Sequence, residues 1–229
     1  QVALRKGEGV RVAGESFIPF GSRETEDVVG DIRSTGADAI INTINGSSNI
    51  GFFSALHQQG LDPSRFPVIS LSIAEGEIRD IGPERLKGHF AVWNYFQSLP
   101  TAENQAFITR FRERYGMGRV TSDPIATAYT QIKLFAEAAR GAAALTPEHL
   151  RAQLASVDMD TPAGRIRFDP VTGHFSKHVY IGQVSAEGQF EVIKNWNNGD
   201  LVPPQPFPFR DLSAEFALEA EGAAAAERR

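Results

Sequence analysis

The sequence predicts an α/β protein with a parallel sheet in its first half and a β-hairpin in its second half. Up to residue 96, short apolar runs alternate with segments of helical spacing, which is typical of right-handed βαβ units. After Asp158 the apolar residues instead recur at every second position, as they do in a hairpin. The 229 residues are enough for one large domain or two small lobes.

The first half contains predicted strands separated by helices. The strands are expected over Val10–Ile18, Ala37–Ile44, Pro67–Ser72 and His89–Phe96. Compact apolar runs of this kind, such as Ala37–Ile44, are typical of buried parallel strands. One helix is expected from about Thr25 to Gly36, and a second ends at Gly60, since glycine is favoured just past a helix end.

The middle of the chain is predicted to be helical. Apolar residues at helical spacing precede Gly116, and Asp123-Pro124 predicts the start of a long helix, with Asp as N-cap and Pro at the first helical position. The apolar stripe of that long helix comprises Ile125, Ala128, Tyr129, Ile132, Phe135 and Ala139. Thr146-Pro147 repeats the start signal for a shorter helix.

The last third predicts a hairpin whose turn lies at residues 186–188, between alternating apolar residues on each side. Asp158 and Asp160 are interpreted as a turn before this hairpin, because the oxygen ligands of a calcium loop do not follow them. The segment Pro203–Pro208 is expected to be extended. Residues from about 215 onward are expected to form a frayed helix or a disordered tail.

The composition argues against several classes of protein. A net charge of −5 with both signs mixed along the chain argues against a nucleic-acid surface and against a basic membrane-binding face. The sequence has no cysteine, and no apolar run approaches the roughly 20 residues needed to span a bilayer. It also lacks the phosphate loop, the nucleophile elbow and the dinucleotide fingerprint, so we expect no enzyme, no cofactor and no metal site.

Three polar loops lie where open α/β sheets bind ligands, beyond the carboxyl ends of strands. They are Asn45–Asn49, Ser72–Glu75 and Thr121–Asp123. Each also has a purely structural explanation: a turn for the first, a capping box between Ser72 and Glu75 for the second, and a helix cap for the third. If the three loops converge, they form a small pocket of hydroxyls, amides and one carboxylate.

Four segments in order resemble the urea ABC-transporter substrate-binding proteins, within the branched-chain amino-acid receptor group of type I periplasmic binding proteins. They are Ile40–Gly46, Ser70–Glu75, Trp93–Ser98 and Thr121–Pro124. The resemblance runs from about Val10 to Phe209 and extends to the short-chain amide sensors. It implies the type I fold, with a parallel-sheet lobe that has helices on both faces, part of a second lobe and a C-terminal hairpin.

The resemblance also implies a division of the chain. Residues 1–93 would form the core of lobe two, 94–157 would return to lobe one, 158–210 would carry the hairpin and the Pro-rich segment back to lobe two, and 211–229 would be a tail. Members of the family carry a further N-terminal segment that builds most of lobe one. We therefore expect this chain, which begins at Gln1, to be a C-terminal fragment.

The implied function is capture of a small neutral amide, above all urea, by closure of two lobes. The implied contacts are the hydroxyls of Ser72 and Ser122, the Asn45 amide, Asp123 as an acceptor of N–H groups, and Tyr95 as an aromatic wall, with Gly46 and Ser70 beside them. The implied partner is the membrane permease of the transporter, and the implied location is the periplasm or a lipid anchor outside the cytoplasmic membrane. A cytosolic amide-sensing regulator and a branched-chain amino-acid-binding protein remain the alternatives.

Overall fold

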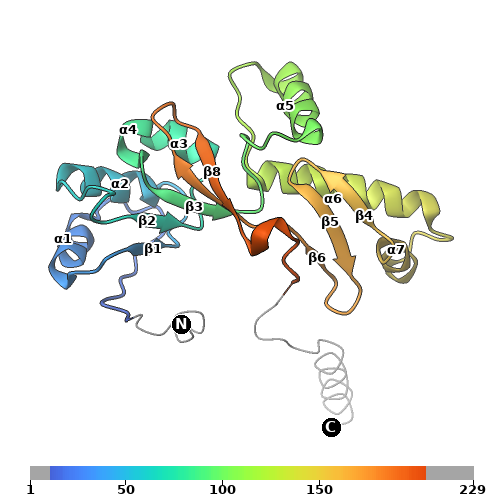
Figure 1. The fold of residues 1–229 in the computed structure, drawn as a ribbon, viewed down its shortest axis with the longest axis horizontal. Coiled ribbons are helices and arrows are strands. Elements are labelled where there is room, and N and C mark those ends of the chain that lie inside the picture. The colour runs from blue at the N-terminus through green and yellow to red at the C-terminus, as the bar shows by residue number, and fades with distance from the viewer. Residues whose placement is uncertain (1–10, 205–229) are drawn as a thin grey trace, which may run out of the picture.

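A computed structural model describes residues 11–204, and its larger part is a five-stranded sheet covered by helices (Figure 1). Three parallel strands come first: β1 (Ile40–Asn42), β2 (Val68–Ser70) and β3 (Phe90–Trp93). The hairpin of β7 (Tyr180–Val184) and β8 (Phe190–Asn195) then adds two antiparallel strands, in the order β1-β2-β3-β7-β8. The predicted parallel sheet and the returning hairpin are both confirmed.

Within residues 11–204, four helices pack in a row against one face of this sheet, and not against both faces as expected, because the successive right-handed crossovers run in one direction along β1-β2-β3. They are α1 (Glu26–Thr35), α2 (Ser48–Gln58), α3 (Glu75–Ile81) and α4 (Pro83–Leu86). Helix α1 ends at Gly36, whose φ of 67° is the left-handed conformation that glycine adopts without strain. Phe52 and Phe53 of α2 reach the core that Phe190 of β8 also enters, although these residues are far apart in the sequence.

Burial alternates along the strands, as expected for a pleated sheet with one covered face. Val68, Tyr180 and Val184 are buried on the helix-covered side. Side chains of the opposite face remain partly or largely exposed, among them Ile41 at 57%.

The remaining elements lie beside the sheet rather than on it (Figure 1). They are the helices α5 (Ala102–Tyr115), α6 (Asp123–Gly141) and α7 (Pro147–Leu154), the strands β4 (Asp158–Thr161), β5 (Gly164–Asp169) and β6 (His174–Ser176), and the short 3₁₀ helix η2 (Asn197–Gly199). Helix α7 begins as predicted, because the Thr146 hydroxyl accepts the His149 N–H at its first turn.

Two predictions in the flanking segments are wrong. Residues 11–18 form no strand, and Val12 and Phe17 there are exposed, since no neighbouring strand pairs with this stretch in residues 11–204. The expected turn at Asp158 and Asp160 is instead strand β4 of a three-stranded antiparallel sheet. Asp158 is held there by ion pairs to Arg165 and Arg167 of β5.

The apolar stripe expected on α6 is not the face that the helix buries. Ala126, Leu134 and Ala138 are buried, whereas Ile132 is 71% and Phe135 55% exposed. Helix α6 packs on α7, and within residues 11–204 nothing covers Ile132 and Phe135. The Pro-rich segment beyond residue 204 and the predicted tail lie outside the described residues.

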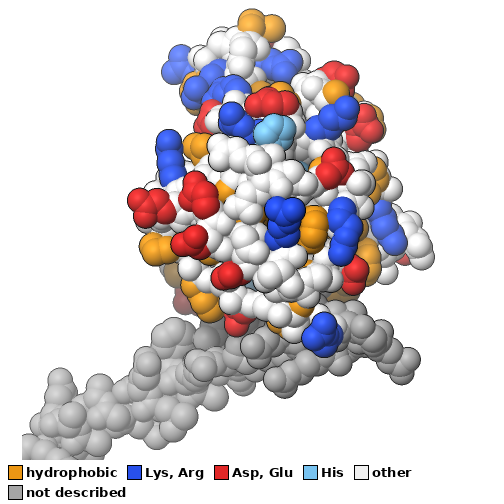
Figure 2. Space-filling view, turned by 90° about the vertical axis from the view of Figure 1, so that its left-hand side faces the viewer, with side chains coloured by type: hydrophobic (Ala, Val, Ile, Leu, Met, Phe, Trp, Pro, Cys, Tyr) orange, Lys and Arg blue, Asp and Glu red, His pale blue; other side chains and the backbone are white. Residues whose placement is uncertain are grey.

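The surface carries mixed charges. On the face that Figure 2 shows, Lys and Arg side chains are interspersed with Asp and Glu. None of the helices within residues 11–204 is both long and apolar enough to cross a membrane.

Candidate ligand-binding site

The carboxyl ends of β1 and β2 meet in a buried polar network. Asn42 donates from Nδ2 to Oδ1 of Asn49 at 3.0 Å and to Oγ of Ser70 at 3.2 Å, and its own Oδ1 accepts the Ile44 N–H at 2.8 Å. Asn42, Asn49 and Ser70 are all at least 98% buried. Because each polar atom already has a partner, this network holds the strand ends together rather than presenting groups to a ligand.

The first two predicted loops lie next to this network. The Ser72 hydroxyl donates to the Ile44 carbonyl and so ties the loop after β2 to the loop after β1. Asn45 is exposed, and its amide donates to the carbonyl of Thr43. Gly46 follows with a φ of 66°, which the turn into α2 requires. Asn45, Gly46, Ser70 and Ser72 therefore belong to one cluster, in which Asn45 faces solvent.

The capping-box explanation for Ser72 is wrong. Helix α3 begins at Glu75 with Ala74 as its N-cap, and the Glu77 carboxylate accepts the Ala74 N–H at 3.0 Å. Glu75 instead points inward, where it is 2% exposed.

The third predicted loop contacts the crossover that follows β3. Asp123 is 8% exposed and accepts the Asn94 N–H at 3.1 Å and the Thr127 hydroxyl at 3.3 Å. Burial raises the pKa of Asp123, and the positive charge of Lys177 opposes this rise. Helix α6 begins at Asp123 itself. Its N-cap is therefore Ser122, one residue before the predicted N-cap Asp123.

Tyr95, predicted as an aromatic wall, is fully enclosed. Its ring is 0% exposed, and its hydroxyl lies 2.6 Å from Thr121 Oγ1 and 2.8 Å from Asn104 Oδ1. Burial raises the pKa of the Tyr95 hydroxyl above its ordinary range. In this arrangement Tyr95 joins the crossover to α5 and to the loop before α6, and its ring does not face a cleft.

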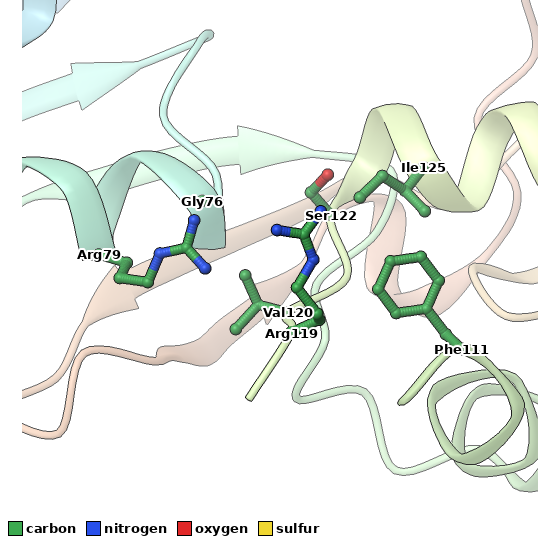
Figure 3. A pocket seen from close by; sticks show the side chains of 7 residues that line it. All are labelled: Gly76, Arg79, Phe111, Arg119, Val120, Ser122 and Ile125. Carbon is green, nitrogen blue, oxygen red and sulfur yellow. The ribbon is translucent and has the colours of Figure 1, made fainter. Parts of the chain in front are cut away.

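Ser122 borders a hollow of about 140 Å³ between α3, α5 and the start of α6. The lining residues are Gly76, Arg79, Phe111, Arg119, Val120, Ser122 and Ile125. Arg79 extends from α3 and Arg119 from the segment before α6, and their guanidinium groups point toward one another (Figure 3). Arg79 pairs with the neighbouring Asp80 at 3.4 Å, and within residues 11–204 no carboxylate pairs with Arg119.

This hollow is suited to an oxygen-bearing ligand. The two guanidinium groups and the Ser122 hydroxyl supply N–H and O–H donors, and Phe111 and Ile125 supply an apolar wall (Figure 3). Of the seven predicted site residues, only Ser122 lines it. Arg79 and Arg119 were not among the predicted contacts, although Arg119 lies just before the predicted loop Thr121–Asp123.

The chain matches a family model described as "Periplasmic binding protein domain" over residues 2–212. A partial match also exists to a protein of Geobacillus stearothermophilus named limonene hydroxylase, at 29% identity over 126 residues. That match covers 55% of this chain but 23% of the other protein, and this share is too small to assign the activity in that protein's name to this chain.

Solved structures share the fold at low identity. A solute-binding protein of an ABC transporter from R. palustris, in complex with 4-hydroxybenzoate, has a TM-score of 0.71 and 22% identity, covering 82% of this chain and 53% of that one. The leucine-, isoleucine-, valine-, threonine- and alanine-binding protein of Brucella ovis has a TM-score of 0.73 and 16% identity, covering 89% and 54%. The chain therefore spans about half the length of these structures.

Proposed function

Because this chain belongs to the periplasmic binding protein domain family, we propose that it is part of the solute-binding component of an ABC importer. The match over residues 2–212 carries the proposal, and the type I fold supports it. The component would act outside the cytoplasmic membrane, in the periplasm or on a lipid anchor, and would deliver its solute to a membrane permease. It would perform no chemistry on the solute and would need no cofactor.

The proposed mode of action is closure of two lobes around the solute. The sheet of β1–β3, β7 and β8 would be the core of one lobe, and the helical section 94–157 would belong to the other. The hollow beside Ser122 lies between α3 of the sheet and α5 and α6 of the helical section, where such a closure would act.

The first candidate solute is urea or a short-chain amide. At the strand ends the polar side chains are the exposed Asn45 amide and the Ser72 hydroxyl, whose hydrogen is already donated to the Ile44 carbonyl, and neither would neutralise a charged ligand. Asp123, the one predicted carboxylate, is buried and already accepts the Asn94 N–H, so it is poorly placed to hold an amino-acid ammonium. These groups favour a neutral solute over a branched-chain amino acid.

A second candidate, an aromatic carboxylate, is favoured by one observation. The guanidinium groups of Arg79 and Arg119, which line the same hollow, suit a carboxylate, and Phe111 in that lining suits a ring. The R. palustris relatives of the same fold are described in complex with 4-hydroxybenzoate and benzoate, although at 22% and 18% identity.

Calorimetry on the complete protein, with any chain that flanks these residues, separates the candidates. Urea, acetamide, benzoate, 4-hydroxybenzoate and leucine would be titrated in turn, and the melting temperature recorded, since a ligand that binds only the folded state raises it. We expect heat and a higher melting temperature with urea or acetamide. Benzoate binding without urea binding would establish the second candidate, and leucine binding alone would reject both.

The arginines provide a matched set of variants. Arg79→Ala with Arg119→Ala should abolish benzoate binding if the second candidate holds, and should leave urea binding within about threefold if the first holds, since a neutral solute needs no cation. Arg33→Ala, an exposed arginine of α1, is the control for loss of charge. Absence of any binding to the folded complete protein would overturn the proposed function.

A further inference from the structure

Glu75 is a carboxyl buried between α3 and the crossover that follows β3. Its side chain is 2% exposed, and Oε1 accepts the Gln97 N–H at 2.5 Å. Oε2 is enclosed and has no hydrogen-bond partner within residues 11–204. A charged carboxylate in such a place loses its hydration and leaves one of its two oxygens without a hydrogen bond, so the enclosure suits the neutral acid better.

Gln97, the partner of Glu75, lies on the crossover between β3 and α5, which would be a hinge in the proposed closure of two lobes, and it connects the segments around it. Its Oε1 accepts the Thr121 N–H at 2.8 Å and lies 3.2 Å from the Thr121 hydroxyl, and its Nε2 donates to Gln189 Oε1 at 3.1 Å. Its carbonyl accepts from Asn104 Nδ2 at 2.9 Å. Through one residue, Glu75 is thus coupled to α5, to the loop before α6 and to the turn of the β7–β8 hairpin.

We propose that Glu75 is a positioning residue of the hinge, which holds the crossover firmly when its carboxyl is neutral and loosens it when the carboxyl is charged. The neutral acid keeps the bond from the Gln97 N–H to its carbonyl oxygen without placing a charge in the core. Ionisation creates an unsatisfied buried charge that is relieved by drawing in water or by moving the carboxyl outward. Either movement pulls on Gln97 and hence on Thr121, which directly precedes Ser122 and Asp123.

The charged groups around Glu75 favour the neutral form. Burial is the main cause that raises the pKa of Glu75 to about 7, and the carboxylates of Asp123 on α6 and Glu77 on α3 raise it further. The N–H groups of Gln97 and of Glu75 itself act in the opposite direction. On the crossover, the nearby Tyr95 stays neutral, since burial raises its pKa.

Two cations act on neighbours of Glu75. The positive charge of Lys177, after β6, opposes the rise in the pKa of Asp123, and that of Arg112 on α5 opposes the rise in the pKa of Tyr95. The causes that set the pKa of Glu75 itself are its burial, the N–H groups of Gln97 and Glu75, and the carboxylates of Asp123 and Glu77. A change of protonation is therefore expected near neutral pH, and only its effect on solute capture rests on the proposed function.

The amide resonance of Gln97 tests the proposal without a ligand. In ¹H–¹⁵N spectra of the complete protein, between about pH 5.5 and about pH 8.5, we expect this resonance to shift with a midpoint at about 7. In Glu75→Gln, which keeps an acceptor for the Gln97 N–H but cannot ionise, the shift should disappear. In Glu84→Gln, which removes an exposed carboxylate of α4, it should remain.

Two results would overturn the inference: a Gln97 amide that does not titrate in the unaltered protein, or one that titrates equally in Glu75→Gln. The first needs no variant, so poor folding of Glu75→Gln cannot obscure it. Where a solute binds, its dissociation constant should increase from about pH 6 to about pH 8 in the unaltered protein and stay constant in Glu75→Gln. A solute-binding failure with an intact Gln97 titration rejects the proposed function, and the coupling of Glu75 ionisation to the crossover would still hold.

Discussion

The ring centroid of Phe190 on β8 lies 4.5 Å from the ring centroid of Phe96 on the crossover, and both side chains are at most 1% exposed. This contact joins the last strand of the sheet to the segment that leaves the third. The hairpin is therefore part of the core of the first-half sheet, even though nearly 100 residues separate Phe96 from Phe190.

Phe190→Ala should lower the free energy of unfolding by about 3–5 kcal/mol, the usual cost of removing a buried ring. Ile193→Ala on the same strand, where the side chain is 53% exposed, should cost less than about 1 kcal/mol. Guanidinium unfolding followed by circular dichroism measures both. Equal effects would mean that β8 does not enter the core.

Gly182→Ala should destabilise the protein by about 1–3 kcal/mol through overpacking. A Cβ at this position of β7 would lie 2.8 Å from Cζ of Phe96 and 3.1 Å from Cβ of Phe190, and both of these side chains are buried. Gly30→Ala is the matched control, because a Cβ there meets nothing within 4 Å and helix α1 gains about 0.5–1 kcal/mol from alanine. Melting temperatures should therefore move in opposite directions.

His89 should make the fold sensitive to acid. It is 3% exposed, its Nδ1 accepts the Val68 N–H at 3.1 Å, and burial lowers its pKa to about 4 from 6.5. Because the pKa of His89 is lower in the folded state, the folded state is stabilised above pH 6.5, where the imidazole is neutral. This contribution is on the order of 3 kcal/mol, and it is lost as the pH falls from 6.5 through 4.

The variant His89→Asn keeps an acceptor for the Val68 N–H and cannot be protonated, so its stability should fall less steeply over this range. His57→Asn, an exposed position of α2, should follow the unaltered protein. The difference in the free energy of unfolding between His89→Asn and the unaltered protein, taken at each pH, isolates the effect of His89 from that of Glu75. The raised pKa of Glu75 acts in the opposite sense. Its stabilisation is present below its unfolded pKa of 4.5 and is lost as the pH rises through 7. Parallel pH curves for His89→Asn and the unaltered protein would contradict this account.

Ser72→Ala should cost about 1 kcal/mol of stability, because it removes the hydrogen bond to the Ile44 carbonyl that joins the first two loops. Ser34→Ala, which removes an exposed bond to the Asp31 carbonyl, should cost less. Guanidinium must be the denaturant, since urea is a proposed ligand. A loss of about 1 kcal/mol in the free energy of urea binding, measured where the variant is folded, would assign Ser72 a role in binding as well.

The sequence by itself determined the order of the elements and the sheet they form. Apolar spacing at short range predicted β2, β3, α2 and the β7–β8 hairpin, because burial of one face imposes a period that is visible within a few residues. The spacing wrongly predicted a strand over residues 11–18, where apolar and polar residues alternate but no neighbouring strand of the described residues pairs with them. It also failed on α6, where the covered face is decided by α7 rather than by the most apolar stripe.

Only the tertiary structure decided what the polar side chains do. Ser72 and Tyr95 carry the expected chemistry, yet their hydroxyls are bonded to Ile44, Thr121 and Asn104, which lie between 9 and 28 positions away in the sequence. The hollow that both Arg79 and Arg119 line and the enclosure of Glu75 against Gln97 likewise arise from the meeting of distant segments. A hydrogen bond or a buried charge depends on which groups meet in space, and a local pattern of residues does not contain that information.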